Sequence, residues 1–215
     1  FAKVQSQFGD KIPAQQKQML DMIWSMPFAW PPKPPESVTT VDKELINDTI
    51  KESKMDATYL TKIADEGSRI NINMLNSPAK GLRDMTKDLL LQIFENRMKN
   101  DEEYARTHQD QPFQKIINNM IDWEDDDRTS LNGGDERSQF TNLKTEEQMP
   151  PNRWFRTVEE IKLVPGMTED IFNQLKDQIT VYGSVSVNPN YAPTGVLKAI
   201  DPSFTDEVIS KITER

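Results

Sequence analysis

The segment from Ile121 to Phe140 limits the possible folds of this chain more than any other stretch. Acidic side chains crowd the residues from Asp122 to Glu136, and Gly133 and Gly134 separate the two acidic groups. Because like charges repel, this density of carboxylates opposes folding unless a cation or a basic partner neutralises it. Carboxylates on a glycine-bent loop are also the oxygen ligands that Ca²⁺ prefers. The spacing departs from the EF-hand pattern, so a metal site and a solvated acidic loop both stay open.

Composition sets the outer limits on fold and function. A chain of 215 residues has room for one large domain or two small ones. Its formal net charge of −9 argues against the phosphate backbone of a nucleic acid as partner. The sequence has no cysteine, which excludes disulfides and thiolate chemistry. No apolar run reaches the length of a membrane span and no signal peptide opens the chain, and a first residue other than Met predicts a processed or trimmed piece.

Before residue 74 the pattern changes from helical to extended. Apolar residues recur at three- and four-residue spacing over Phe1–Gln18, which predicts helical structure with a break near Pro13. The proline-rich run 31–35 ends any helix. Region 38–63 is ambiguous, since its residues suit either strands or a helix. The alternation in Arg69–Asn73 predicts a strand.

The middle of the chain is predicted to be mostly helical. A helix is expected from Pro78 to Met98 and another over Phe113–Ile121, each with an apolar face. The polar stretch Asn100–Gln111 between them is predicted to be a loop. Beyond the acidic segment, Thr157–Leu175 has the pattern of a helix, a tight Pro-Gly turn and a second helix, and begins with the signature of a capping box.

The C-terminal part returns to strands before ending in helices. Residues 179–183 and 185–187 are predicted to be strands because β-branched and aromatic residues dominate them. Pro193 and Thr205 are each expected to begin a helix.

Catalytic motifs are missing from the sequence, so we predict no enzymatic activity. His108 is the only histidine, and in a polar loop it is expected to be a surface residue rather than a base. No nucleophile elbow and no phosphate-binding glycine loop is present. A metal-dependent hydrolase would need a second catalytic group outside the acidic loop. The hairpin over Thr157–Leu175 suggests an alternative, a helix-hairpin-helix nucleic-acid module, but its surroundings are acidic.

Five short motifs occur in the same order as in one protein family. They are Asp65-Glu66-Gly67 with residues 70–73 (ININ), Ile121-Asp122-Trp123 with Asp125 and Asp127, Gly134 with Glu136, residues 158–167 (VEEIKLVPGM), and residues 179–183 (ITVYG) followed by residues 187–193. In these motifs the chain resembles the K-type minor pseudopilin of the type II secretion system, also called general secretion pathway protein K. The resemblance extends from about Trp24 to the end of the chain. At Glu124 the chain departs from the family, which usually has an apolar residue there.

The resemblance implies an α+β fold with three segments. Members of the family have a pilin-like α/β domain, with an N-terminal helix and an antiparallel sheet, that is interrupted by a large helical insertion. We therefore expect residues 1–74 and 177–215 to form the pilin-like domain, and residues 75–176 to form the helical insertion. Members also carry an N-terminal membrane helix that this chain lacks. The resemblance thus implies the periplasmic domain of a protein anchored in the bacterial inner membrane.

Function and metal binding are implied in the same way. Family members cap the tip of the periplasmic pseudopilus together with the I- and J-type minor pseudopilins, and exported proteins are further candidate partners. They bind calcium in the insertion, which by motif match assigns Asp125, Asp127 and Glu136 as ligands, with Asp122 a weaker candidate. Phe1, Val4 and Phe8 of the first helix are expected to pack on neighbouring pseudopilins.

Overall fold

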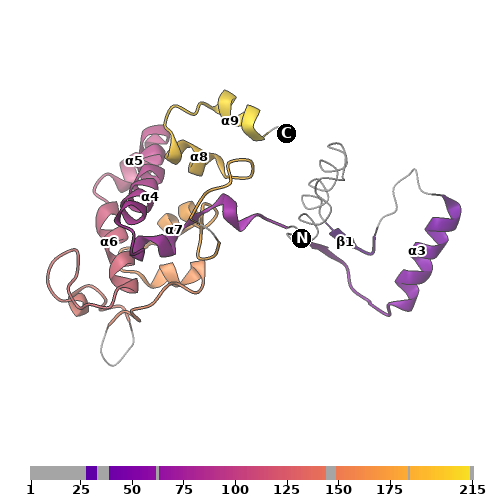
Figure 1. Cartoon of the computed structure of the whole chain (residues 1–215), viewed down its shortest axis with the longest axis horizontal. Coiled ribbons are helices and arrows are strands. Elements are labelled where there is room, and N and C mark those ends of the chain that lie inside the picture. Colours follow the sequence, from indigo (N-terminus) through magenta and orange to yellow (C-terminus); the bar gives the residue numbers. More distant parts are fainter. Residues whose placement is uncertain (1–27, 33–38, 62, 144–148, 184, 214–215) are drawn as a thin grey trace. The chain divides into compact units, whose positions relative to one another are not determined.

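The computed structural model of the protein describes residues 28–32, 39–61, 63–143, 149–183 and 185–213 (Figure 1). The chain divides into two compact units, residues 1–64 and residues 65–215, which are described separately below. The predicted helix over Phe1–Gln18, with the partner contacts expected of its apolar residues, lies outside the described residues.

The first unit combines a short antiparallel sheet with one described helix. Strand β1 (Phe28–Trp30) pairs with strand β2 (Tyr59–Thr61). Helix α3 (Thr40–Glu52) lies between them in the chain. Region 38–63, which the sequence left ambiguous, therefore holds a helix followed by a strand. Every residue of β2 is exposed, so within the described residues its side chains have no core to cover.

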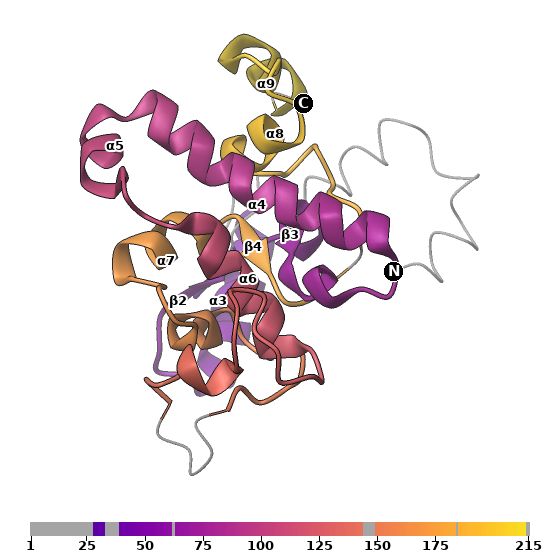
Figure 2. The ribbon, with the colours of Figure 1, turned by 90° about the vertical axis from the view of Figure 1, so that its left-hand side faces the viewer.

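The second unit is built around its longest helix, α4 (Lys80–Asn100). Figure 2 shows α4 running diagonally across the unit, with α8 (Thr194–Ile200) and α9 (Asp206–Thr213) above it and α6 (Phe113–Glu124) below it. Helix α4 packs on α8, α6 and α5 (Glu102–His108). Its core-facing residues are Thr86, Leu90, Ile93 and Phe94.

The only sheet described in this unit is a short parallel pair. Strand β3 (Ile70–Asn71) pairs with β4 (Ile179–Thr180), which is distant in sequence. Both strands are shorter than predicted, and residues 185–187 form no strand. For β3 the reason lies in local capping, because the Asn71 side chain accepts a hydrogen bond from the Asn73 N–H at 3.1 Å. This bond turns the chain directly into the 3-10 helix η2 (Ile72–Asn76).

The two compact units divide the chain after residue 64, and the assignment of residues 1–74 and 177–215 to a pilin-like domain and of residues 75–176 to an insertion stays a prediction. Residues 177–215 belong to the second unit rather than to the first, because β4 pairs with β3 and α8 packs on α4. Between residues 75 and 176 the described chain matches the predicted helical content. It contains α4, α5, α6 and α7 (Glu169–Leu175), and its only strand-like pairing is an isolated bridge between Thr129 and Asp135.

The loop predicted over Asn100–Gln111 is wrong, because helix α5 occupies most of it. Asp101 caps this helix, since its carboxylate accepts a hydrogen bond from the Tyr104 N–H at 2.9 Å. Tyr104 and His108 then face inward one turn apart, and both are buried. Two aromatic residues at this spacing supply the packing that a short polar helix lacks.

The predicted helix-turn-helix over Thr157–Leu175 begins with a 3-10 helix, η4 (Val158–Leu163), rather than an α-helix. The capping box does not form: the Thr157 side chain makes no cap bond, and the Glu160 carboxylate accepts hydrogen bonds from Arg153 instead. The turn after η4 requires glycine. Gly166 has φ +87°, and a side-chain carbon there would lie 3.0 Å from the Ile116 side chain.

Apolar side chains from β3, β4, α4, α6, α7, α8 and α9 meet in one core in the second unit. Its fully buried large members include Phe94, Phe140, Ile72, Ile117 and Ile171. Of the helices in the described part of the chain, none has both the length and the apolarity needed to cross a membrane.

Candidate metal centre

The acidic segment begins on the last turn of α6 and returns as a hairpin-like loop. Asp122 lies in α6, and Asp125 is the residue that ends it. The loop closes through hydrogen bonds from the Ser130 N–H to the Gly134 carbonyl at 3.0 Å and from the Glu136 N–H to the Arg128 carbonyl at 3.2 Å. Gly133 and Gly134 occupy the left-handed region, with φ +93° and +84°, as a turn this tight requires.

This loop brings three carboxylates together. Oxygen atoms of Asp122, Asp125 and Glu136 lie within 4.8 Å of one another. Asp122 accepts hydrogen bonds from the Leu131 N–H, at 3.1 and 3.2 Å to its two oxygens. Glu136 is fully buried, yet neither of its carboxylate oxygens has a hydrogen-bond partner within the described residues. Buried carboxylates are normally hydrogen-bonded or paired with a positive charge, so these two oxygens differ from the usual case.

The electrostatics of the site agree with this geometry. Burial, followed by the nearby charges of Asp125 and Asp122, raises the pKa of Glu136 to about 7. Burial and the charges of Asp127 and Asp122 raise the pKa of Asp125 to about 6. Burial also raises the pKa of Asp122, although the Leu131 N–H partly offsets it. Each shift means that the ionised form is disfavoured in the folded protein, and a bound cation would remove that penalty.

Asp127 is the predicted ligand that the structure does not bring into this group. Its side chain is exposed, and its Oδ1 atom accepts a hydrogen bond from the Thr129 N–H at 2.6 Å. Asp122, the weaker candidate from the sequence, is instead a full member of the group. Helical geometry explains why Asp122, and not Asp127, belongs to the group. Asp122 lies in the last turn of α6, which directs its side chain into the protein and toward the loop.

Glu124 is a buried acid that sequence reasoning did not single out as part of the site. It is 2% exposed, and neither carboxylate oxygen has a hydrogen-bond partner in the described part of the chain. Burial, with a smaller contribution from the charge of Asp125, raises its pKa to about 8. One feature of the sequence could have pointed to a buried Glu124: it stands at a position where the K-type minor pseudopilins usually have an apolar residue.

The donor set restricts which ion would fit. The three grouped side chains offer only carboxylate oxygens, without nitrogen or sulfur. Such a set suits Ca²⁺ or Mg²⁺ and disfavours Zn²⁺. An irregular loop that ends in a glycine turn suits the larger ion, because Ca²⁺ tolerates irregular geometry better than Mg²⁺ does.

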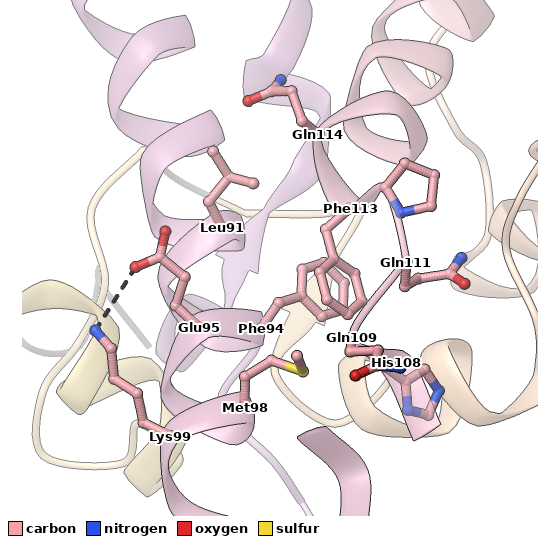
Figure 3. Close-up of a pocket in the computed structure, with 11 residues that line it drawn as sticks. Leu91, Phe94, Glu95, Met98, Lys99, His108, Gln109, Gln111, Phe113 and Gln114 are labelled. Atoms are coloured by element: carbon pink, nitrogen blue, oxygen red, sulfur yellow. Dashed lines mark ion pairs between the residues drawn. The ribbon is translucent and has the colours of Figure 1, made fainter. Parts of the chain in front are cut away.

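A groove separate from the carboxylate group lies between α4 and the start of α6. Figure 3 shows this groove, whose volume is about 520 Å³, with Phe94 and Phe113 stacked in its wall and the Glu95–Lys99 ion pair at its edge. His108 also lines it and is buried, which corrects the prediction of a surface residue. Its Nδ1 atom lies 3.1 Å from the Tyr104 carbonyl oxygen, and its Nε2 atom lies 3.1 Å from an Asp170 carboxylate oxygen. His108 therefore ties two helices together and is not paired with a nucleophile.

The fold and the carboxylate group together define the class to which this domain belongs. The fold is a helical domain with a small sheet, and its distinctive site is a carboxylate cluster rather than a set of groups arranged for acid–base or nucleophilic chemistry. The second unit is therefore a mainly helical domain that carries a group of three neighbouring carboxylates.

Comparison with known proteins identifies the family. Residues 68–184 match the family model described as type II secretion system (T2SS), protein K, which is more than half of the chain. The chain therefore belongs to the type II secretion system protein K family, as the resemblance predicted. This match favours that family over a helix-hairpin-helix nucleic-acid module. No curated protein matches the chain.

One similar solved structure is a chain in the crystal structure of the GspK-GspI-GspJ complex from the enterotoxigenic Escherichia coli type 2 secretion system. The identity is 18% and the TM-score is 0.48. The match covers 64% of the present chain and 48% of that chain, so it spans about half of the length of that relative.

Proposed function

We propose that this chain is part of a minor pseudopilin that caps the tip of the type II secretion pseudopilus. The match of residues 68–184 to the protein K family carries this proposal. In this role the protein is a non-enzymatic assembly subunit in the periplasm, held to the inner membrane by an N-terminal helix. Its partners are the I- and J-type minor pseudopilins, and exported proteins are further candidates.

The pilin-like arrangement supplies the mechanism. In our proposal the first unit, with its helix and antiparallel strands, belongs to the pilin-like part, and the helical second unit is the bulky head. A subunit with such a head can occupy only the end of a fibre, because the head blocks the addition of another subunit above it. All three residues of β2 are exposed, which is consistent with a surface that neighbouring subunits cover.

The test is co-purification of the protein with the I- and J-type subunits. We expect a stable ternary complex whose components elute together in size-exclusion chromatography. Each subunit purified alone is the control. Separate elution of this protein from a mixture in which the other two subunits associate would contradict the proposal.

We further propose that Ca²⁺ binds to the carboxylates of Asp122, Asp125 and Glu136. The bare, buried oxygens of Glu136 support this assignment most strongly, since a bound cation would give them a partner. The ion would join the end of α6 to the returning loop and so stabilise the head by mass action. Binding of Ca²⁺ by Asp127 stays a prediction. The Asp127 carboxylate would have to bind the ion either while it accepts the hydrogen bond from the Thr129 N–H or after that bond has broken.

Calcium titration followed by isothermal calorimetry tests this assignment. We expect one binding event that Glu136→Gln abolishes, and Asp127→Ala decides whether the fourth predicted residue belongs to the shell. Magnesium at the same concentration is the competitor ion. Equal heats for the parent protein and Glu136→Gln would show that the ion does not bind here.

A further inference from the structure

The side chain of Asn132 joins the acidic loop to α6 through three hydrogen bonds. Its Nδ2 atom donates to the Lys115 carbonyl oxygen at 2.9 Å and to the Asn119 Oδ1 atom at 2.7 Å. Its Oδ1 atom accepts a hydrogen bond from the Asn118 Nδ2 atom at 3.0 Å. Because a backbone carbonyl oxygen can only accept, the contact with Lys115 fixes which end of the Asn132 amide donates. Both N–H groups of the amide are therefore used, and the side chain is held in one orientation.

The partners of Asn132 lie on the same face of α6 as one carboxylate of the proposed calcium site. Lys115, Asn119 and Asp122 follow one another at intervals of four and three residues, which is the spacing of a single helix face. The Asp122 carboxylate accepts hydrogen bonds from the Leu131 N–H at 3.1 and 3.2 Å. Two consecutive residues of the loop, Leu131 and Asn132, are therefore bound to neighbouring positions on this face.

The helix side of this contact is itself firmly packed. Asn119 is 5% exposed, and its Nδ2 atom donates to the Pro165 carbonyl oxygen at 3.0 Å. The Asn118 Oδ1 atom accepts a hydrogen bond from the Lys87 Nζ atom of α4 at 3.2 Å. These bonds tie α6 to α4 and to the turn after η4. Asn132 is thus bound to a fixed part of the second unit and not to another mobile side chain of the loop.

Backbone hydrogen bonds connect Asn132 to the carboxylate at the far end of the loop. The Gly133 N–H donates to the Ser130 carbonyl oxygen at 2.8 Å, and the Glu136 N–H donates to the Arg128 carbonyl oxygen at 3.2 Å. The two sides of the loop are therefore joined to each other at both ends. Since Glu136 follows Asn132 by four residues in this hairpin-like loop, the place of Asn132 on α6 sets where the loop returns Glu136.

We propose that Asn132 is a positioning residue for the proposed calcium site, because it holds the loop on α6 and so keeps Glu136 beside Asp122 and Asp125. The proposal rests on the calcium assignment made above. Repulsion among the three carboxylates pushes the loop away from α6 when no cation is bound, and the three hydrogen bonds of Asn132 oppose this. A site that is ordered before binding loses less conformational entropy when the ion arrives. Residues that orient metal ligands in this way raise the affinity for the metal without touching it.

The experiment measures the affinity of the purified protein for Ca²⁺ by isothermal titration calorimetry. We expect Asn132→Ala to weaken binding about 10-fold, the lower end of the range for residues that orient metal ligands. Asn132→Asp separates positioning from charge. It keeps the size of the side chain but replaces the donating Nδ2 atom by an oxygen that faces two acceptors, on Lys115 and Asn119. An added negative charge alone would tighten calcium binding, whereas loss of the two donated bonds should weaken it.

Asn96→Ala is the matched control for a general loss of stability. Asn96 is also a half-buried asparagine, and its Nδ2 atom joins α4 to α8 by donating to the Lys198 carbonyl oxygen at 3.2 Å. This variant should melt lower than the parent protein and bind calcium with the affinity of the parent. In chelator, the amide hydrogens of Leu131 and Gly133 should exchange with solvent faster in Asn132→Ala than in the parent, and at the parent rate in Asn96→Ala.

The possible results separate this proposal from the calcium assignment. If the parent protein binds calcium and Asn132→Ala binds it equally well, or Asn132→Asp binds it more tightly, the positioning role is refuted while the calcium assignment stands. An equal loss of affinity in Asn96→Ala would trace the effect to stability and would also refute the role. If the parent protein does not bind calcium, or Glu136→Gln binds it like the parent, the calcium assignment fails and the role of Asn132 fails with it.

Discussion

Replacing Glu136 by glutamine should change stability in opposite directions with and without calcium. Glu136 is fully buried, and its pKa rises from 4.5 to about 7 on folding. A raised carboxylate pKa stabilises the protein below the unfolded value and loses that contribution as the pH rises through the folded value. At pH 7.5 the ionised Glu136 therefore costs about 3 kcal/mol of folding free energy in the absence of a cation. Glutamine carries no charge and avoids this cost.

Calcium should reverse the order of the two stabilities, because the ion binds to and stabilises the parent protein but not the Glu136→Gln variant. At a calcium concentration about 1,000 times the dissociation constant, binding adds about 4.1 kcal/mol to the stability of the parent protein, which exceeds the cost of the ionised Glu136 by about 1 kcal/mol. In a domain of this size a change of 1 kcal/mol moves the melting temperature by about 2–4 °C. We therefore expect Glu136→Gln to melt higher than the parent in chelator, and to gain nothing when calcium is added.

Thermal melts at pH 7.5, in chelator and in calcium, measure both effects. Asp126→Asn is the matched control, because this exposed acid lies in the same loop and outside the carboxylate group. It should respond to calcium like the parent protein. A Glu136→Gln protein that melts lower than the parent in chelator, or that gains as much from calcium, would refute the reasoning.

Three further predictions concern the second unit. Burial raises the pKa values of Glu124, Asp125 and Glu136 to about 8, 6 and 7. Without calcium, the free energy of unfolding should therefore fall as the pH rises from about 4 to about 8. Denaturant unfolding measures this dependence, and a free energy of unfolding that does not change over this pH range would contradict the prediction. Phe94→Ala should cost about 3–5 kcal/mol, because Phe94 is 1% exposed and stacks on a neighbouring ring, and urea midpoints measure the loss. Asn73→Ala should cost about 1–3 kcal/mol, since it leaves buried backbone groups of the adjacent segments unpaired; an unchanged urea midpoint would argue against that role.

Local sequence patterns predicted the two main helices of the second unit correctly. The long apolar stripe of α4 and the shorter one of α6 are visible in the sequence because helical periodicity is a local property. The order of five short motifs was enough to place the chain in its family, which the match over residues 68–184 confirms. The acidic segment was also recognisable as the most unusual site, because charge density is read directly from composition.

Contacts between distant residues decided what the sequence could not. Residues 177–215 belong to the second unit because β4 pairs with β3 more than a hundred residues away, and no local pattern encodes that pairing. Helix α5 exists where polarity predicted a loop, because buried packing of Tyr104 and His108 outweighs weak helix propensity. Tertiary structure likewise chose among the carboxylates: the loop returns Glu136 to a buried position beside Asp122, while Asp127 turns outward to bond Thr129. The sequence determines which charged side chains are available. Their burial depends on how the chain folds back on itself, and so does the stabilisation that a bound cation would provide.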